Sequence, residues 1–143
     1  MRIRDIVRTK GDAVVTVRPD ATVRELLATL AEHNIGAAII SEDDNTILGI
    51  ASERDVVRHL NTRGADLLTS PVTEIMTSDV RTCGLDAHLD DVRGVMTQRR
   101  IRHLPVTRDG RLAGIVSIGD VVKSAIDELE TERAHLVGYI QRS

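Results

Sequence analysis

The chain carries one sequence pattern twice, and this internal repeat limits its fold more than any other feature. Residues 49–58, GIASERDVVR, match residues 114–123, GIVSIGDVVK, and each copy has a serine followed three positions later by an aspartate. Upstream, residues 21–40 align with residues 87–106. Self-similarity of this kind indicates a duplicated structural unit. We therefore expect two domains followed by a helical extension, with bounds at residues 2–64, 71–126 and 127–143.

Each copy is expected to fold in the order strand, helix, strand, strand, helix. Apolar residues at helical spacing, such as Val23, Leu26 and Leu30 in the first copy, predict the central helix. Short β-branched or apolar runs bounded by turn residues predict the strands, at 14–17, 37–40 and 47–51 in the first copy and at 80–83, 103–106 and 112–116 in the second. A closing helix is predicted to begin near Ser52 in one copy and near Ser117 in the other.

The size of the repeat indicates that the two copies pack together. A unit of about 60 residues has only a marginal hydrophobic core when it stands alone. Two copies packed sheet to sheet would bury far more apolar surface. We therefore expect an α+β (α/β sandwich) architecture with pseudo-twofold symmetry and two equivalent clefts between the halves.

The composition excludes several classes of partner. Tyr139 is the only aromatic residue in the 143-residue chain, so the core must be aliphatic and a planar ligand would lie between aliphatic side chains. The aromatic platforms on which single-stranded nucleic acids stack are absent. A net charge of −3 also gives no general attraction to nucleic acids or anionic membranes. With no signal peptide or membrane-spanning run in the sequence, we expect a cytoplasmic protein.

The pattern of potential ligands and nucleophiles argues against a metal site or an active site. No two of the five histidines are three or four positions apart, and Cys83 is the only cysteine. Neither a phosphate-binding loop nor a nucleophile elbow surrounds Ser117. We therefore expect no metal, no catalytic cofactor and no enzymatic activity.

The repeated Ser-x-x-Asp motif has two interpretations. At the junction of a strand and a helix it is a capping signature, in which the serine oxygen accepts a free backbone amide and the acid lies near the positive helix end. A helix N-terminus also suits a phosphate, and an ionised aspartate matches the two hydroxyl donors of a ribose. The pattern alone leaves both interpretations open, because a cap would be duplicated too.

The duplicated motif gains a more specific meaning from its neighbours. With Gly-Ile-Val-Ser-Ile-Gly-Asp at 114–120 and Ile-Arg-His-Leu-Pro-Val at 101–106, the sequence resembles a tandem pair of cystathionine-β-synthase (CBS) domains over about residues 2–126. The resemblance implies a stand-alone Bateman module, which is a disc of two βαββα-type halves. Its clefts are expected to bind adenosine-containing ligands such as AMP, ADP, ATP, NAD or S-adenosylmethionine.

The resemblance also implies roles for individual residues. Asp120 and Asp55 would hold ribose hydroxyls, and Ser117 and Ser52 would contact the ribose or the adjacent phosphate. Further residues would line the two clefts, namely Thr82, Ile101, Leu104 and Ile115 with Asp120, and Thr16, Ile35, Ala38 and Ile50 with Asp55.

The two copies differ in the basic residues that could meet a phosphate. The second copy has Arg102 and His103 where the first has glycine and alanine. The first copy would therefore depend on Arg54 or Arg58, either of which could instead belong to a solvated helix face. We expect the Asp120 cleft to bind the ligand more tightly.

These features together predict a regulatory protein that senses an adenine nucleotide and transmits a conformational change to a partner protein. The alternative is a structural dimerisation or scaffold module whose clefts stay empty. An apolar stripe at helical spacing near the C-terminus predicts a helix that packs against a second chain, and we expect a homodimer. The residues of this stripe are Val122, Ile126, Leu129, Leu136 and Ile140.

Overall fold

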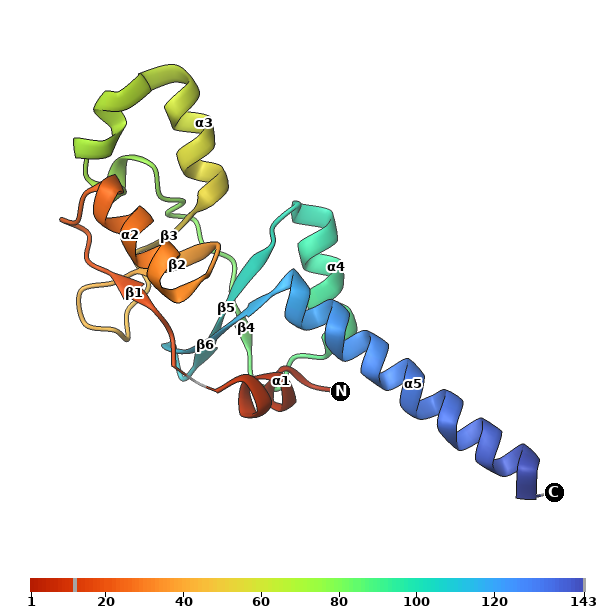
Figure 1. The fold of residues 1–143 in the computed structure, drawn as a ribbon. Coiled ribbons are helices and arrows are strands. Elements are labelled where there is room, and N and C mark those ends of the chain that lie inside the picture. Colours follow the sequence, from red (N-terminus) through yellow and green to blue (C-terminus); the bar gives the residue numbers. More distant parts are fainter. Residues whose placement is uncertain (12, 143) are drawn as a thin grey trace.

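Helices and strands follow the same order in the two halves of the molecule. The computed structural model describes residues 1–11 and 13–142. After a leading helix, α1 (Ile3–Lys10), the first half consists of β1 (Thr16–Val17), α2 (Val23–His33), β2 (Ala37–Ile40), β3 (Gly49–Ser52) and α3 (Glu53–Arg63). The second half consists of β4 (Cys83–Gly84), α4 (Leu89–Arg99), β5 (His103–Arg108), β6 (Arg111–Ser117) and α5 (Ile118–Arg142). The predicted βαββα order is confirmed in both halves (Figure 1).

Each half contains a three-stranded sheet built around a hairpin. The central strands are β2, between β1 and β3, and β5, between β4 and β6. Within the hairpins the strands are antiparallel, with Ile39 opposite Ile50 in the first half and Pro105 opposite Ile115 in the second. The first strand of each sheet runs parallel to the central strand. A parallel pair requires a crossover connection, which α2 and α4 provide.

The first strand of each sheet is shorter than the sequence predicts. A strand is expected at 14–17, but β1 contains only the last two of these residues, and β4 is Cys83–Gly84 rather than 80–83. Strand propensity depends on a neighbouring strand that offers partners, and β1 and β4 each pair with only two residues of the central strand. The chain before β4 has another use, because Thr77 forms an antiparallel bridge with Ile50.

The cores of both halves are aliphatic, as the near absence of aromatic residues predicts. Leucine, isoleucine, valine, alanine and methionine from the sheets and helices form one buried cluster in each half. Fully buried members of the first cluster include Val23, Leu26, Ala38, Ile40 and Leu67, and those of the second include Ile3, Leu104, Val106, Val116 and Val121.

The segment that precedes each half packs on the other half. Ile3 and Ile6 of α1 belong to the core of the second half, and Ile3 N donates to Ala87 O at 2.9 Å. Between the halves, Val72 and Ile75 belong to the core of the first half. Each hydrophobic core therefore contains residues from a segment that lies next to the other half in the sequence. The predicted domain bounds describe the repeated sequence and remain a prediction.

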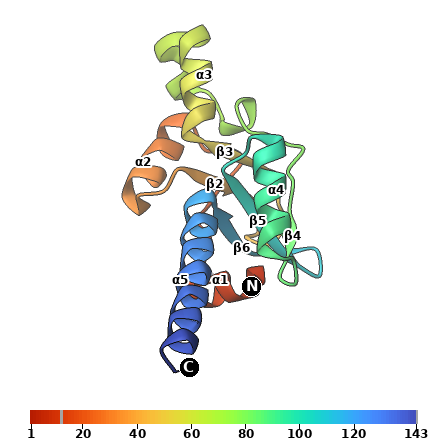
Figure 2. The same ribbon diagram turned by 90° about the vertical axis from the view of Figure 1, so that its right-hand side faces the viewer.

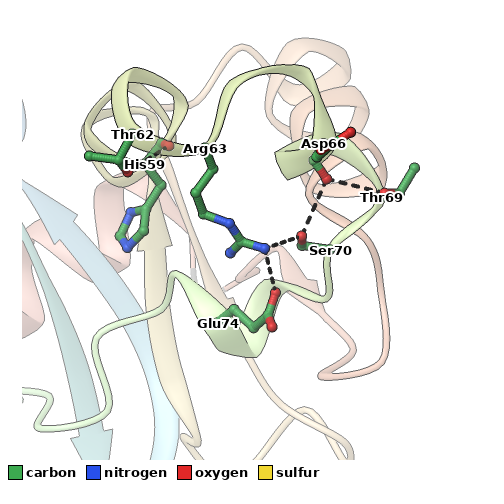
Figure 3. Close-up of polar contacts among 7 residues, drawn as sticks. All are labelled: His59, Thr62, Arg63, Asp66, Thr69, Ser70 and Glu74. Atoms are coloured by element: carbon green, nitrogen blue, oxygen red, sulfur yellow. Dashed lines mark hydrogen bonds and ion pairs between the residues drawn. The ribbon is translucent and has the colours of Figure 1, made fainter.

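Arg63 fastens the linker between the halves to the end of α3. The linker contains two short 3-10 helices, η1 (Gly64–Thr69) and η2 (Val72–Glu74). The Arg63 guanidinium donates to Ser70 Oγ at 2.6 Å and to Glu74 Oε2 at 3.1 Å, as Figure 3 shows. These bonds help to position the residues that follow, which reach the candidate functional site.

The two sheets lie in the middle of the molecule, and the helices lie outside them (Figures 1 and 2). Both faces of β2 are buried, because Ala38 and Ile40 point into the first core while Ala37 and Ile39 on the opposite face are covered as well. Across the halves, Leu112 N donates to Asn45 O at 2.8 Å. The fold is therefore the predicted α+β pair of βαββα halves.

The C-terminal helix α5 extends well beyond the second half (Figure 1). Several large apolar side chains on it are exposed, including Leu129 and Leu136 at 64% each. Despite its 25 residues, neither α5 nor any other helix in residues 1–11 and 13–142 is long and apolar enough to cross a membrane.

Candidate functional site

The Ser-x-x-Asp motifs cap the N-termini of α3 and α5. Ser52 Oγ accepts the Asp55 amide at 3.2 Å, and Asp55 Oδ2 accepts the Ser52 amide at 2.9 Å. Ser117 and Asp120 repeat this arrangement with the same two distances. The capping interpretation is therefore confirmed for both copies. The cap uses only one oxygen of the Asp55 carboxylate, because no residue that the structure describes donates a hydrogen bond to Asp55 Oδ1.

A cleft of about 230 Å³ opens beside the first of these caps. Its floor includes Ser52 and Asp55 at the start of α3 and Ile50 of β3. Residues from the linker and from the second half form the other walls. The complete lining is Gly36, Ala37, Ile50, Ser52, Glu53, Arg54, Asp55, Arg58, Thr77, Asp79, Val80, Arg81, Arg100, Ile101, Arg102 and His103.

Three residues predicted for the Asp120 cleft lie where the two halves meet and contribute to the cleft at Asp55. Ile101, Arg102 and His103 were assigned to the Asp120 cleft, but they line the cleft at Asp55. They also border the second cap, since His103 pairs with Ser117 across the hairpin and Arg102 O accepts the Ile118 amide at 2.8 Å. The start of β5 in the second half lies opposite the start of α3 in the first.

Other predicted residues lie outside the Asp55 cleft. Ala38 and Leu104 are fully buried in the two cores, and Ile35 packs against the first core. Thr16 instead donates to the Asp44 carboxylate near the turn of the first hairpin. Thr82 is exposed in the segment before β4.

Sequence reasoning missed the contribution of the linker. Thr77, Asp79, Val80 and Arg81 all line the cleft. They reach it because Thr77 and Ile50 exchange two backbone hydrogen bonds of 2.9 and 3.0 Å, which adds the linker to the edge of β3. The repeat held a signal for this segment, because Asp5-Ile6-Val7 before the first strand resembles Glu74-Ile75-Met76, which directly precedes Thr77. Glu53 and Arg100 were missed as lining residues too.

Positive charge predominates among the residues around the cleft. Five arginines line it, and they are Arg54, Arg58, Arg81, Arg100 and Arg102. The acidic residues of the lining are Glu53, Asp55 and Asp79. Guanidinium groups bind phosphate through paired hydrogen bonds. The cleft thus combines an acidic group at a helix start with a surplus of phosphate-binding groups and apolar surface from isoleucine and valine.

His103 lies near the starts of α3 and α5, and charged residues at both helix starts affect its pKa. Burial lowers the pKa of its imidazole below the ordinary value of 6.5, and the charges of Lys10 and Arg102 lower it further. The carboxylates of Glu53 and Asp120 oppose this change without reversing it. The imidazole is therefore neutral at pH 7 in the free protein.

Asp120 has a different environment from Asp55. Lys10 Nζ of α1 lies 2.7 Å from Asp120 Oδ2 and donates a second bond of 3.0 Å to Ile115 O. Burial raises the pKa of Asp120, but the hydrogen bonds from Lys10 and from the Ser117 amide outweigh this effect, and the pKa lies below its ordinary value. The second Ser-x-x-Asp motif is thus engaged in an ion pair within the chain.

Comparison with known proteins agrees with this architecture. The sequence model of the CBS domain matches residues 3–62 and again residues 72–127. Among solved structures, the CBS-domain containing protein ATU1752 from Agrobacterium tumefaciens is 42% identical. The match covers 87% of this chain and 99% of that one, with a TM-score of 0.85.

Two similar structures contain adenosine compounds. The CBS domain protein PAE2072 from Pyrobaculum aerophilum, complexed with AMP, is 27% identical over 84% of this chain and 89% of its own, with a TM-score of 0.73. The CBS domain pair of protein MJ0100, in complex with 5′-methylthioadenosine and S-adenosyl-L-methionine, is 26% identical. That match covers 86% of this chain and 98% of the other, with a TM-score of 0.76.

Proposed function

The chain belongs to the CBS-domain family as a tandem pair of these domains, and on this premise we propose that it is a regulatory sensor that binds an adenine nucleotide in the Asp55 cleft. The observation that carries the proposal is the meeting of Asp55 at a helix start with arginines from the opposite half in one cleft. Two similar CBS proteins hold AMP, or 5′-methylthioadenosine and S-adenosylmethionine, which supports an adenosine-containing ligand.

Each part of a nucleotide has a matching group in the cleft. The ribose diol would donate to the Asp55 carboxylate, whose Oδ2 is occupied by the cap and whose Oδ1 faces no donor within the described chain. The adenine would lie against the aliphatic side chains of Ile50, Val80 and Ile101. No aromatic partner is needed, because aliphatic side chains also provide the apolar lining that is typical of ligand pockets.

The arginines favour a phosphorylated ligand within the adenosine class. Arg54 and Arg58 come from α3, Arg81 from the linker, and Arg100 and Arg102 from the second half. Charge-assisted bonds to phosphate are stronger than neutral hydrogen bonds. A sulfonium ligand such as S-adenosylmethionine brings a positive charge to the same surface. We therefore rank AMP, ADP, ATP and NAD above it.

Ligand binding would signal by favouring one arrangement of the two halves. The cleft has walls from both halves, so a bound nucleotide would bridge them and stabilise the arrangement to which it binds more tightly. The exposed apolar face of α5 suits a homodimer, through which the change would reach a partner protein. In this proposal the protein has no catalytic role, and a phosphate-release assay with ATP should stay at background.

Thermal unfolding with a panel of nucleotides tests the proposal. AMP, ADP, ATP, NAD and S-adenosylmethionine would be compared, with GMP as the control for base selectivity. A ligand at a hundredfold excess over its dissociation constant adds about 2.7 kcal/mol of stability, which raises the midpoint by several degrees in a domain of this size. A selective rise with a phosphorylated adenine compound supports the sensor. No rise with any compound would favour the ligand-free scaffold.

A further inference from the structure

The two Ser-x-x-Asp caps have different neighbours on the adjacent strand. In the first half, the carbonyl of Ile50 accepts the backbone amide of Thr77 at 2.9 Å. In the second half, the carbonyl of Ile115, which matches Ile50 in the repeat, accepts the Lys10 ammonium at 3.0 Å. A charged side chain thus takes the place of a backbone donor, and it brings a cation to Asp120.

A difference in length between the copies explains this replacement. Six residues separate Val7 from Val14 in the first copy, but only three separate Met76 from Val80 in the second. The longer segment lets α1 continue to Lys10, whereas η2 ends at Glu74 and the chain after it runs along β3. Lys10 therefore lies on helical residues with no counterpart in the second copy.

The Lys10 contact engages the carboxylate that a ribose would need. Asp120 Oδ2 accepts both the Lys10 ammonium at 2.7 Å and the Ser117 amide at 2.9 Å, and the Asp120 side chain is 25% exposed. As at Asp55, no described residue donates to the other carboxylate oxygen, Asp120 Oδ1, but a ribose diol that needs both oxygens would have to share the carboxylate with the ammonium or displace the ammonium from Asp120 and from the Ile115 carbonyl. A charge-assisted hydrogen bond of this kind corresponds to a loss of affinity of about tenfold or more for a competing ligand.

We propose that Lys10 acts as an internal occupant of the second cleft, so that each chain binds one nucleotide, at Asp55, rather than two. This inference rests on the proposed nucleotide-binding function. It reverses the order expected from the sequence, in which the Asp120 cleft binds more tightly. The restriction to one bound nucleotide per chain then depends on α1, a helix outside the βαββα units.

Isothermal titration calorimetry with ATP, and with AMP in parallel, tests this inference on the full chain. The wild type should bind one nucleotide per chain, and Lys10→Met should expose a second site and raise the stoichiometry to two. Lys10→Arg keeps the positive charge and should remain at one. In the Lys10→Met background, adding Asp120→Ala should return the stoichiometry to one.

A second variant identifies which site the wild type uses. Arg54→Glu reverses a charge that lines only the Asp55 cleft and leaves both caps intact, so it should weaken nucleotide binding at least tenfold in the wild type. The double variant Arg54→Glu/Lys10→Met should bind one nucleotide at the Asp120 site, with the affinity that this site has in Lys10→Met alone. Circular dichroism would show that each variant is folded.

The outcomes separate the inference from the proposed function. Two sites in the wild type, or one site in Lys10→Met, would overturn the inference while nucleotide binding stands. Absence of binding in every variant, including Lys10→Met, would overturn both. Recovery of a second site that depends on Asp120 would support both.

Discussion

His103 of the second half lies directly against Gly36 of the first. A Cβ atom at Gly36 would stand 3.5 Å from His103 Cε1, and it would also stand 2.8 Å from Glu53 Oε1. The two halves therefore lie in contact where the cleft begins. Because the cleft has walls from both halves, substitutions in the second half should alter the affinity for the nucleotide proposed to bind at Asp55.

Arg102 provides a direct test of this shared cleft. Replacing Arg102 by alanine should weaken ATP binding about tenfold, since a charge-assisted contact to phosphate is lost, but should leave the much weaker binding of adenosine unchanged. Arg99→Ala is a matched control, because Arg99 is an exposed arginine at the end of α4 that does not line the cleft. Calorimetry of both ligands measures the difference. Equal effects of the two substitutions would remove Arg102 from the phosphate site.

Gly49 should be intolerant of a side chain for steric reasons. A Cβ atom there would lie 2.6 Å from Met76 Sδ and 2.9 Å from the backbone oxygen of Thr77, which is held by its pairing with Ile50. We expect Gly49→Ala to lower the free energy of unfolding by about 1–3 kcal/mol. Urea unfolding followed by circular dichroism measures this change.

Gly94 supplies the control for this substitution. It lies within α4, and a Cβ atom there would have no atom within 4 Å other than those of its chain neighbours and of the backbone of its own helix. Gly94→Ala should therefore raise stability by about 0.5–1 kcal/mol, because alanine loses less backbone entropy in a helix. Destabilisation of the same size at both positions would contradict the close packing of the linker on β3.

The low pKa of His103 predicts a loss of stability in mild acid. A histidine whose pKa is lowered by folding contributes stability above its unfolded value, and that contribution is lost as the pH falls from about 6.5 through the folded pKa. The unfolding midpoint of the wild type should thus fall more steeply between pH 6.5 and 5 than that of His103→Asn. Thermal unfolding across this range measures both slopes. Parallel curves would show that His103 titrates without a cost to folding.

The exposed apolar face of α5 predicts that dimerisation depends on Leu136. Burying a leucine side chain contributes about 1.5–3 kcal/mol, so Leu136→Glu should raise the dimer dissociation constant tenfold or more. Light scattering coupled to size exclusion, over a dilution series, measures this change. Thr131→Glu adds the same charge on the opposite face of the helix and should leave the dimer intact. A monomeric wild type would rule out this use of α5.

The repeat was sufficient to predict the βαββα order, both hairpins and both helix caps. These features depend on neighbours within a few residues. Helical spacing places Leu26 and Leu30 on one face, and three positions bring Asp55 back to the amide of Ser52. The lengths of β1 and β4 could not be predicted in the same way, because they depend on pairing with two residues of a central strand more than 20 positions away in the sequence.

The set of residues that line a cleft is decided by contacts between residues far apart in the sequence. Arg102 and His103 reach the cleft at Asp55, as well as the cap at Ser117, because the two halves face each other, and no spacing within either copy encodes that relation. Lys10 contacts Asp120, which is 110 positions away, because α1 packs on the second half and not on the first half, which follows it directly in the sequence. Local periodicity specifies the elements and their caps, whereas the partner of each charged group depends on how the assembled halves and the linker bury their apolar faces.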